Sequence, residues 1–154
     1  MRALPLLLLW PVSAGAETMA DTHFARNFCW ERSYSTAHLA EHPEQTVTSF
    51  RIGRAPLGHP RAPGKLAMEL TLTFRGANGG RGGEEIPWAA ECRPNEDALR
   101  CFLEGDAGEF RIEAAGQDIL VTVGEEGLSF EGRELHLLQA DEGDDRAFLL
   151  RRCG

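Results

Sequence analysis

The segment His38-Leu39-Ala40-Glu41-His42 carries residue types that can hold a catalytic zinc ion. It reads H-x-x-E-H, a pattern in which two histidines one helical turn apart bind zinc and the glutamate acts as a general base. Ser35 can cap a helix that runs to His42, which would place both histidines on one face. One hypothesis is therefore a metal-dependent hydrolase with His38 and His42 as ligands and Glu41 as base.

Features near this segment favour a structural role instead. Pro43 follows at once, and the residue before a proline is pushed out of helical geometry, so His42 would not be held as a ligand. A histidine at a helix C-terminus is also favoured by the helix dipole. A catalytic site needs three protein ligands, and His23, the candidate for the third, lies in an N-terminal stretch whose position no pattern fixes. We expect structural histidines and no enzymatic activity.

The acidic run Asp141-Glu142-Gly143-Asp144-Asp145 offers the oxygen ligands that Ca²⁺ prefers. It lacks the fixed ligand spacing of a calcium-binding loop, so a charged turn between two strands is the preferred interpretation. The chain also has no G-x-S-x-G motif that would present a nucleophilic serine. We expect no cofactor, with zinc and calcium as the two metals to test.

The elements that must position these residues are β-strands. From about residue 46 onward apolar and polar residues alternate with a period of two, as in segment 66–74, where Leu70 is expected inside and Thr71 outside. Segment 46–54 is less regular, and a bulge near Ser49 would reconcile its apolar residues. The same alternation recurs in later segments, whose apolar members are Ile86, Trp88, Ala90 and Cys92; Leu99, Cys101 and Leu103; Phe110, Ile112 and Ala114; Ile119, Val121 and Val123; Leu128 and Phe130; Leu135 and Leu137; Phe148 and Leu150.

Turn signals separate these segments. They lie at 105–108, 116–118, 124–127, 132 and 141–145. Short, closely spaced strands without helical crossovers predict an antiparallel up-and-down meander of about eight or nine strands. We expect a closed or nearly closed barrel, because closure removes the strand edges, with a β-sandwich as the alternative. A short helical turn near residues 35–42 would cover one end.

Three aromatic residues are candidates for a ligand site in the mouth of such a barrel. They are Trp30, Tyr34 and Trp88. Large aromatic side chains more often pack in a core, and core packing is the preferred interpretation.

The four cysteines predict two disulfides, because an even number in an exported chain is typical of a disulfide framework. None of them forms a C-x-x-C pair, so neither a zinc ribbon nor a redox site is indicated. Three pairings are possible. The strand pattern favours Cys92–Cys101 as a local clip and Cys29–Cys153 as a bond between the two ends.

Residues 1–16 have the order of features found in a signal peptide: a positive start, an apolar run at 4–12, and the small residues Ala14-Gly15-Ala16. The run is shorter than the roughly 20 residues that a membrane span needs. We therefore expect a periplasmic or extracellular protein with one domain over residues 17–154 and no membrane span. A formal net charge of −8 argues against nucleic-acid binding and is compatible with a basic partner.

A block near the predicted helical turn resembles small exported proteins of proteobacteria that carry no functional assignment. Its residues are Tyr34, Ala37-His38-Leu39-Ala40, His42-Pro43, Gln45 and Val47, an AHLAxHPxQxV pattern. The later Asp144-Asp145-Arg146 and the spacing of Cys92 and Cys101 fit the same resemblance. It covers most of the mature chain in outline, and it implies export but no activity.

The sequence thus predicts an exported, non-enzymatic binding or interaction protein. Two versions remain open: a barrel that holds a small apolar ligand, and an acidic protein that docks on a basic partner such as a cell-wall hydrolase. An unfilled barrel interior would favour the first, and a filled interior the second. The enzymatic alternative is the hydrolase built on His38, Glu41 and His42.

Overall fold

The computed structural model describes residues 18–25, 27–56, 63–76 and 78–154. The predicted signal peptide, residues 1–16, lies outside this part of the chain. Two short helices, α1 (Met19–His23) and α2 (Thr36–Glu41), and a 3₁₀ turn, η1 (Glu104–Asp106), accompany the strands. The strands are β1 (Cys29–Ser33), β2 (Val47–Arg54), β3 (Leu66–Phe74), β4 (Glu85–Asn95), β5 (Ala98–Leu103), β6 (Gly108–Ala115), β7 (Asp118–Glu131), β8 (Leu135–Leu138) and β9 (Ala147–Arg152).

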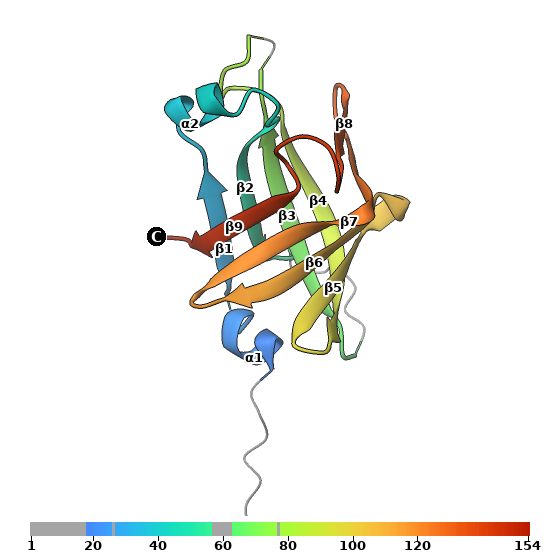
Figure 1. Ribbon diagram of the computed structural model, residues 1–154. Helices are drawn as coiled ribbons and strands as arrows, with labels where there is room; N and C mark the ends of the chain where they lie inside the picture. Colours follow the sequence, from blue (N-terminus) through green and yellow to red (C-terminus); the bar gives the residue numbers. More distant parts are fainter. Residues whose placement is uncertain (1–17, 26, 57–62, 77) are drawn as a thin grey trace, which may run out of the picture.

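The strands form a closed antiparallel barrel with one additional strand (Figure 1). Neighbouring strands pair in the order β6-β5-β4-β3-β2-β1-β9-β7, and the pairing of β6 with β7 closes the ring. Strand β8 pairs with β7 and is not part of the ring. The predicted up-and-down barrel is therefore confirmed, and the sandwich alternative is not formed.

Strand β3 has the predicted alternation, with Leu70 fully buried and Thr71 partly exposed. The irregularity expected near Ser49 is also present, because the pairing of β2 with β3 shifts between Val47 and Ser49. Residue 48, the threonine between them, is the extra residue of this bulge, and it lets Val47 join Phe50 in the core.

The predicted turn at 124–127 is wrong, because these residues belong to one continuous strand, β7. Val123 pairs with Phe110 and Leu128 pairs with Gly108, so four residues of β7 lie opposite Glu109 alone. A bulge absorbs a glycine-rich segment without reversing the chain, and here it turns Glu125 and Glu126 outward.

The alternation predicted for residues 135–137 is out of phase. Leu135 and Leu137 are 59% and 54% exposed, whereas Leu138 is buried. The register explains the difference: Leu138 pairs with the inward-facing Leu128, and Leu137 pairs with Ser129 on the outer face of β7. Strand β8 therefore shows two leucines to solvent.

Aromatic side chains pack against one another inside the barrel. Phe130 on β7 contacts Phe74 on β3 and Trp88 on β4, with ring centroids 5.9 and 5.8 Å apart. These strands come from opposite walls of the ring, so the contacts cross the interior. Phe50 and Phe148 pack edge to face at 5.1 Å in the same buried cluster.

Both predicted disulfides are present. Cys92 and Cys101 lie opposite each other on β4 and β5, with their side chains in the core. Cys29–Cys153 joins the start of β1 to the end of β9, next to a hydrogen bond from the Cys153 N–H to the Cys29 carbonyl. Among the described residues, no helix is long and apolar enough to cross a membrane.

Candidate functional site

The two histidines of the H-x-x-E-H segment lie on α2, which covers one end of the barrel (Figure 1). Ser35 caps the helix by accepting a hydrogen bond from the His38 N–H, and His42 ends it. The rings of His38 and His42 stack with their centroids 4.2 Å apart, and the ring of Tyr34 stacks on that of His38 with a centroid distance of 4.8 Å. The expected helical turn at 35–42 is therefore confirmed.

The hydrogen bonds of His38 bear on its metal-binding ability. The side-chain amide of Gln45 donates to the Val47 carbonyl, so its oxygen accepts from the His38 ring. The acceptor lies 2.9 Å from His38 Nε2, which therefore carries the proton. Nε2 of His38 is thus engaged in the fold, and Glu41 of the same segment points to solvent.

His23, the candidate third ligand, lies at the other end of the barrel on α1 (Figure 1). Its ring packs on Trp30 at 5.8 Å, and its Nε2 is 3.1 Å from the Gly116 carbonyl. The structure therefore does not bring His23 to His38 and His42. No group of three side chains that could hold a metal ion is found in the described part of the chain.

The four carboxylates of the 141–145 run diverge. Asp145 is buried and accepts hydrogen bonds from the Thr46 N–H, the Thr46 hydroxyl and the Val47 N–H. Asp144 lies 3.6 Å from His42 Nδ1. The run thus closes the loop before β9 onto the start of β2, and its acidic side chains do not converge on one point.

The three candidate aromatic residues lie at separate places in the fold. Trp30 is buried and donates its indole N–H to the His23 carbonyl. Tyr34 is buried beside α2, and burial raises the pKa of its hydroxyl. Trp88 donates to the Glu104 carbonyl and packs on Phe130 across the interior. Each of them contributes to packing or to the barrel ends.

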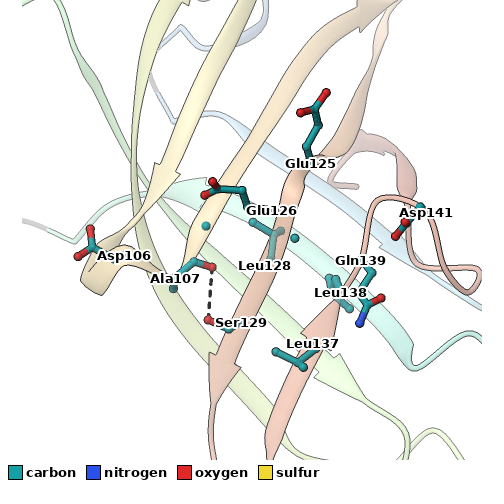
Figure 2. A pocket seen from close by; sticks show the side chains of 12 residues that line it. Asp106, Ala107, Glu125, Glu126, Leu128, Ser129, Leu137, Leu138, Gln139 and Asp141 are labelled. Carbon is teal, nitrogen blue, oxygen red and sulfur yellow. Dashed lines mark hydrogen bonds between the residues drawn. The ribbon is translucent and has the colours of Figure 1, made fainter.

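Leu137, one of the two exposed leucines of β8, lies beside a groove whose charged lining is entirely acidic. Figure 2 shows this acidic groove, which we define by Asp106, Glu125, Glu126 and Asp141 around Leu137. It has a volume of about 270 Å³. Asp106 and Asp141 stand on opposite sides of it, and no lysine or arginine lines it.

Two glycines allow the backbone to form this groove. Gly108 and Gly127 have φ values of +112° and +76°, in the region that glycine tolerates best. A Cβ on Gly108 would lie 2.1 Å from the Gly127 carbonyl oxygen, and one on Gly127 would lie 2.7 Å from that of Leu138. The main chains of strands β6, β7 and β8 therefore approach one another closely beside the bulge of β7 that carries Glu125 and Glu126.

The carboxylates of the acidic groove differ in their ion pairing from those of the barrel wall. Within the described residues, none of the four forms an ion pair. Carboxylates on the barrel wall behave differently: Glu109 pairs with Arg100 at 2.6 Å, and Glu91 pairs with Lys65 at 2.8 Å. The negative charge of the groove is therefore not neutralised by ion pairs within the described part of the chain.

A second groove continues this surface on the other side of Leu137 and Leu138. It has a volume of about 550 Å³, and its charged lining residues, Glu44, Glu142 and Asp145, are again acidic. We call it the α2-side groove, because Glu44 follows α2 in the chain.

The sequence analysis missed this surface for two reasons. The phase of β8 depends on its register with β7, and the carboxylates come from three separate segments around residues 106, 125 and 141. The only available signal was that acidic turns flank the Leu135–Leu137 segment on both sides.

No protein-family model, curated protein or solved structure matches the chain. Its function is therefore inferred from the geometry and charge of its own surface and core.

Proposed function

We propose that this protein is an exported, non-enzymatic binding protein that docks on a basic protein partner through its acidic groove. The barrel with its two disulfides is compatible with a small secreted binding protein, and disulfides persist in oxidising compartments such as the periplasm. The signal-peptide features of residues 1–16 support the same location.

The observation that carries the proposal is the contrast between the core and the surface. The interior is occupied by packed rings from opposite walls, which disfavours a bound apolar ligand. The acidic groove is lined by a leucine that is 54% exposed and by four carboxylates that form no ion pair within the described residues. A leucine among carboxylates suits a partner that brings an apolar contact and several positive charges.

The partner class that we favour is a cationic cell-wall hydrolase, since such enzymes work outside the cytoplasm and carry the complementary charge. The arrangement around His38 and His42 gives less support to a hydrolase of this chain's own. One ring nitrogen of His38 is held by Gln45, and the third histidine lies at the far end of the barrel.

Binding of residues 17–154 to a purified cationic muramidase tests the proposal. We expect Glu125→Lys/Glu126→Lys to weaken binding by about tenfold or more, because each change places like charge against the partner. The matched control Glu41→Lys/Glu96→Lys changes the net charge equally at exposed residues outside the groove and should stay within about twofold.

Salt provides an independent readout of the same interface. Raising the ionic strength from about 50 to 200 mM should weaken wild-type binding and affect the groove variant much less. Equal loss of binding in the groove variant and its control would mean that net charge, and not this groove, drives the interaction. Absence of binding to cationic muramidases would reject this partner class.

A further inference from the structure

Strand β8 has an open edge. In the described part of the barrel β8 pairs with β7 and with no other strand, and it stands at the end of the strand order. Every strand of the ring, in contrast, has a neighbour on both sides. Figure 1 shows β8 beside β7 at the end of the barrel that α2 covers.

The main-chain groups at this edge belong to the two exposed leucines. The Ser129 N–H donates to the Ala107 carbonyl at 2.8 Å, on the β6 side of β7. Ser129 therefore does not exchange hydrogen bonds with its partner Leu137. In an antiparallel ladder, residues of such a pair turn their N–H and C=O groups away from each other, so those of Leu137 face the open edge. The alternation of the ladder gives Leu135 the same orientation.

Strand β8 is short, but it lacks the residue types that usually protect an edge. Natural edge strands are usually blunted by lysine, proline or an inward-pointing charge, and Leu135-His136-Leu137-Leu138 contains neither lysine nor proline. His136 points inward, but its ring stacks on Phe74 at 3.9 Å and packs into the barrel. Two apolar side chains and their free main-chain groups are thus presented together.

The hairpin that carries β8 is anchored before any partner arrives. The Glu84 carboxylate accepts hydrogen bonds from the Arg133 N–H at 2.7 and 2.9 Å, which lowers the pKa of Glu84. The stack of His136 on Phe74 fixes the middle of the strand. A preformed edge reduces the entropy that binding costs.

The space and charge beside the edge select the occupant. A groove of about 680 Å³ borders Glu134 and His136, and its charge is mixed, because Arg75 and Arg133 line it together with glutamates. The α2-side groove borders Leu137 and Leu138 next along the strand, and its charged lining is acidic. The charged residues around Leu137 are acidic in both the α2-side groove and the acidic groove. A second copy of this chain would bring the same carboxylates against them, so like charges oppose a homodimer.

We infer that an extended, basic segment of the protein partner adds to β8 as a strand, hydrogen-bonded to Leu135 and Leu137. This inference rests on the proposed function and specifies its recognition mode. Main-chain hydrogen bonds supply affinity in such strand addition, and side chains supply specificity. Lysine or arginine side chains at the Leu137 end would meet the carboxylates, and apolar residues between them would pack on the leucines.

A short peptide tests the recognition mode directly. The probe is acetyl-Lys-Val-Lys-Val-Lys-amide, and its control is the same peptide with N-methylated valines, which keeps the charge but removes donors. We expect amide hydrogen exchange at Leu135 and Leu137 to slow by about tenfold or more at saturating probe. The N-methylated peptide should bind about tenfold more weakly.

Variants of the protein give a second readout. Leu137→Pro removes the N–H that faces the open edge, while Leu137→Ala keeps it and removes the side chain. We expect Leu137→Pro to bind the probe peptide about tenfold more weakly than Leu137→Ala does. Amide exchange at Phe130 and Leu128 in the free variants reports whether the β7–β8 pair stays formed.

The outcomes separate the two proposals. Binding that depends on Glu125 and Glu126 but leaves the leucine amides unprotected, or equal binding of both peptides, would overturn strand addition and leave acidic docking in place. Binding that ignores Glu125→Lys/Glu126→Lys would count against the proposed function. Dimer formation by the free protein with protected Leu135 and Leu137 amides would make the occupant a second copy and overturn the inference.

Discussion

Two polar side chains, the buried Asp145 and the half-buried Arg75, hold the α2 end of the barrel together. The Arg75 guanidinium donates to the carbonyls of Leu39 and His42 at 2.6 and 2.7 Å, which closes the C-terminus of α2. Asp145 accepts the N–H groups of Thr46 and Val47 at the start of β2. These residues satisfy main-chain groups at a site where the chain leaves regular structure, so each has a large effect on stability.

Two replacements of Asp145 should distinguish the contribution of its hydrogen bonds to stability from the contribution of its charge. Asp145→Ala leaves buried donors without acceptors and should lower the free energy of unfolding by about 2–4 kcal/mol. Asp145→Asn keeps one oxygen in the position of Oδ2, which accepts from both Thr46 donors and from Val47, and should cost less than about 1 kcal/mol. Urea unfolding at neutral pH measures both; equal losses would contradict this account.

The same residue predicts a pH dependence. Burial raises the pKa of Asp145 above its ordinary value of 3.8. The hydrogen bonds from Thr46 and Val47 lower this pKa, but the effect of burial is larger. A raised pKa means that the folded state binds the proton more tightly than the unfolded state. Proton binding by Asp145 therefore stabilises the folded state fully below the ordinary pKa, and this stabilisation is lost as the pH rises through the raised pKa. The unfolding free energy of the wild type relative to Asp145→Asn should therefore fall from about pH 3 to pH 6, and a rise would contradict the prediction.

Zinc titration tests the role of the histidine pair. His38 Nε2 is held by Gln45, so a zinc ion would have to use Nδ1 of His38 or break that hydrogen bond. We expect calorimetry to show binding weaker than about 10 μM, without the three protein ligands of a catalytic site. Sub-micromolar, stoichiometric binding that both His38→Ala and His42→Ala abolish would instead establish a metalloprotein.

Among the elements, β3 shows the clearest division between a buried and a wet face. Leu70 is fully buried between Ile52 and Trp88 on the neighbouring strands, and Thr71 lies between Arg51 and Pro87 on the outer face. Leu70→Ala should therefore lower the free energy of unfolding by about 2–5 kcal/mol, and Thr71→Ala by less than about 1 kcal/mol. Similar losses from the two changes in chemical denaturation would mean that both faces of β3 are packed.

The predictability of the elements follows from how local their determinants are. The alternation of β3 and the bulge in β2 are visible in the sequence, because burial of one face imposes a period of two. The β7 bulge was mistaken for a turn, since glycines at 124 and 127 serve either purpose and only the pairing with β6 decides. The phase of β8 was missed for the same reason, and the acidic groove with it, because both are set by strand pairing between distant residues.

At the scale of the whole molecule, the first and last strands of the barrel share the shortest pairing in the ring. Strands β1 and β9 pair only at Trp30 with Arg152 and at Glu31 with Arg151. Cys29–Cys153 lies beside this pairing and spans 124 residues of sequence. The bond therefore reinforces the point where the ring of strands has the least main-chain pairing.

Removing this bond should cost more than removing most single contacts. On the chain-entropy model, Cys29→Ala/Cys153→Ala should lower the free energy of unfolding by about 4–5 kcal/mol. Guanidinium unfolding of the oxidised wild type and of the variant measures the difference. A loss below about 1 kcal/mol would mean that packing across the seam, and not the cross-link, keeps β1 and β9 together.

The same bond also changes what a protease can do to the molecule. Because it joins the first strand to the last, residues 29–153 form a covalent ring, and one cut within that ring opens it without releasing a fragment. A nick in the exposed glycine segment at 79–82 would leave both pieces linked through Cys29 and Cys153. After a single cleavage the two pieces would remain one covalent molecule, and they would separate on a denaturing gel only after reduction of the disulfide.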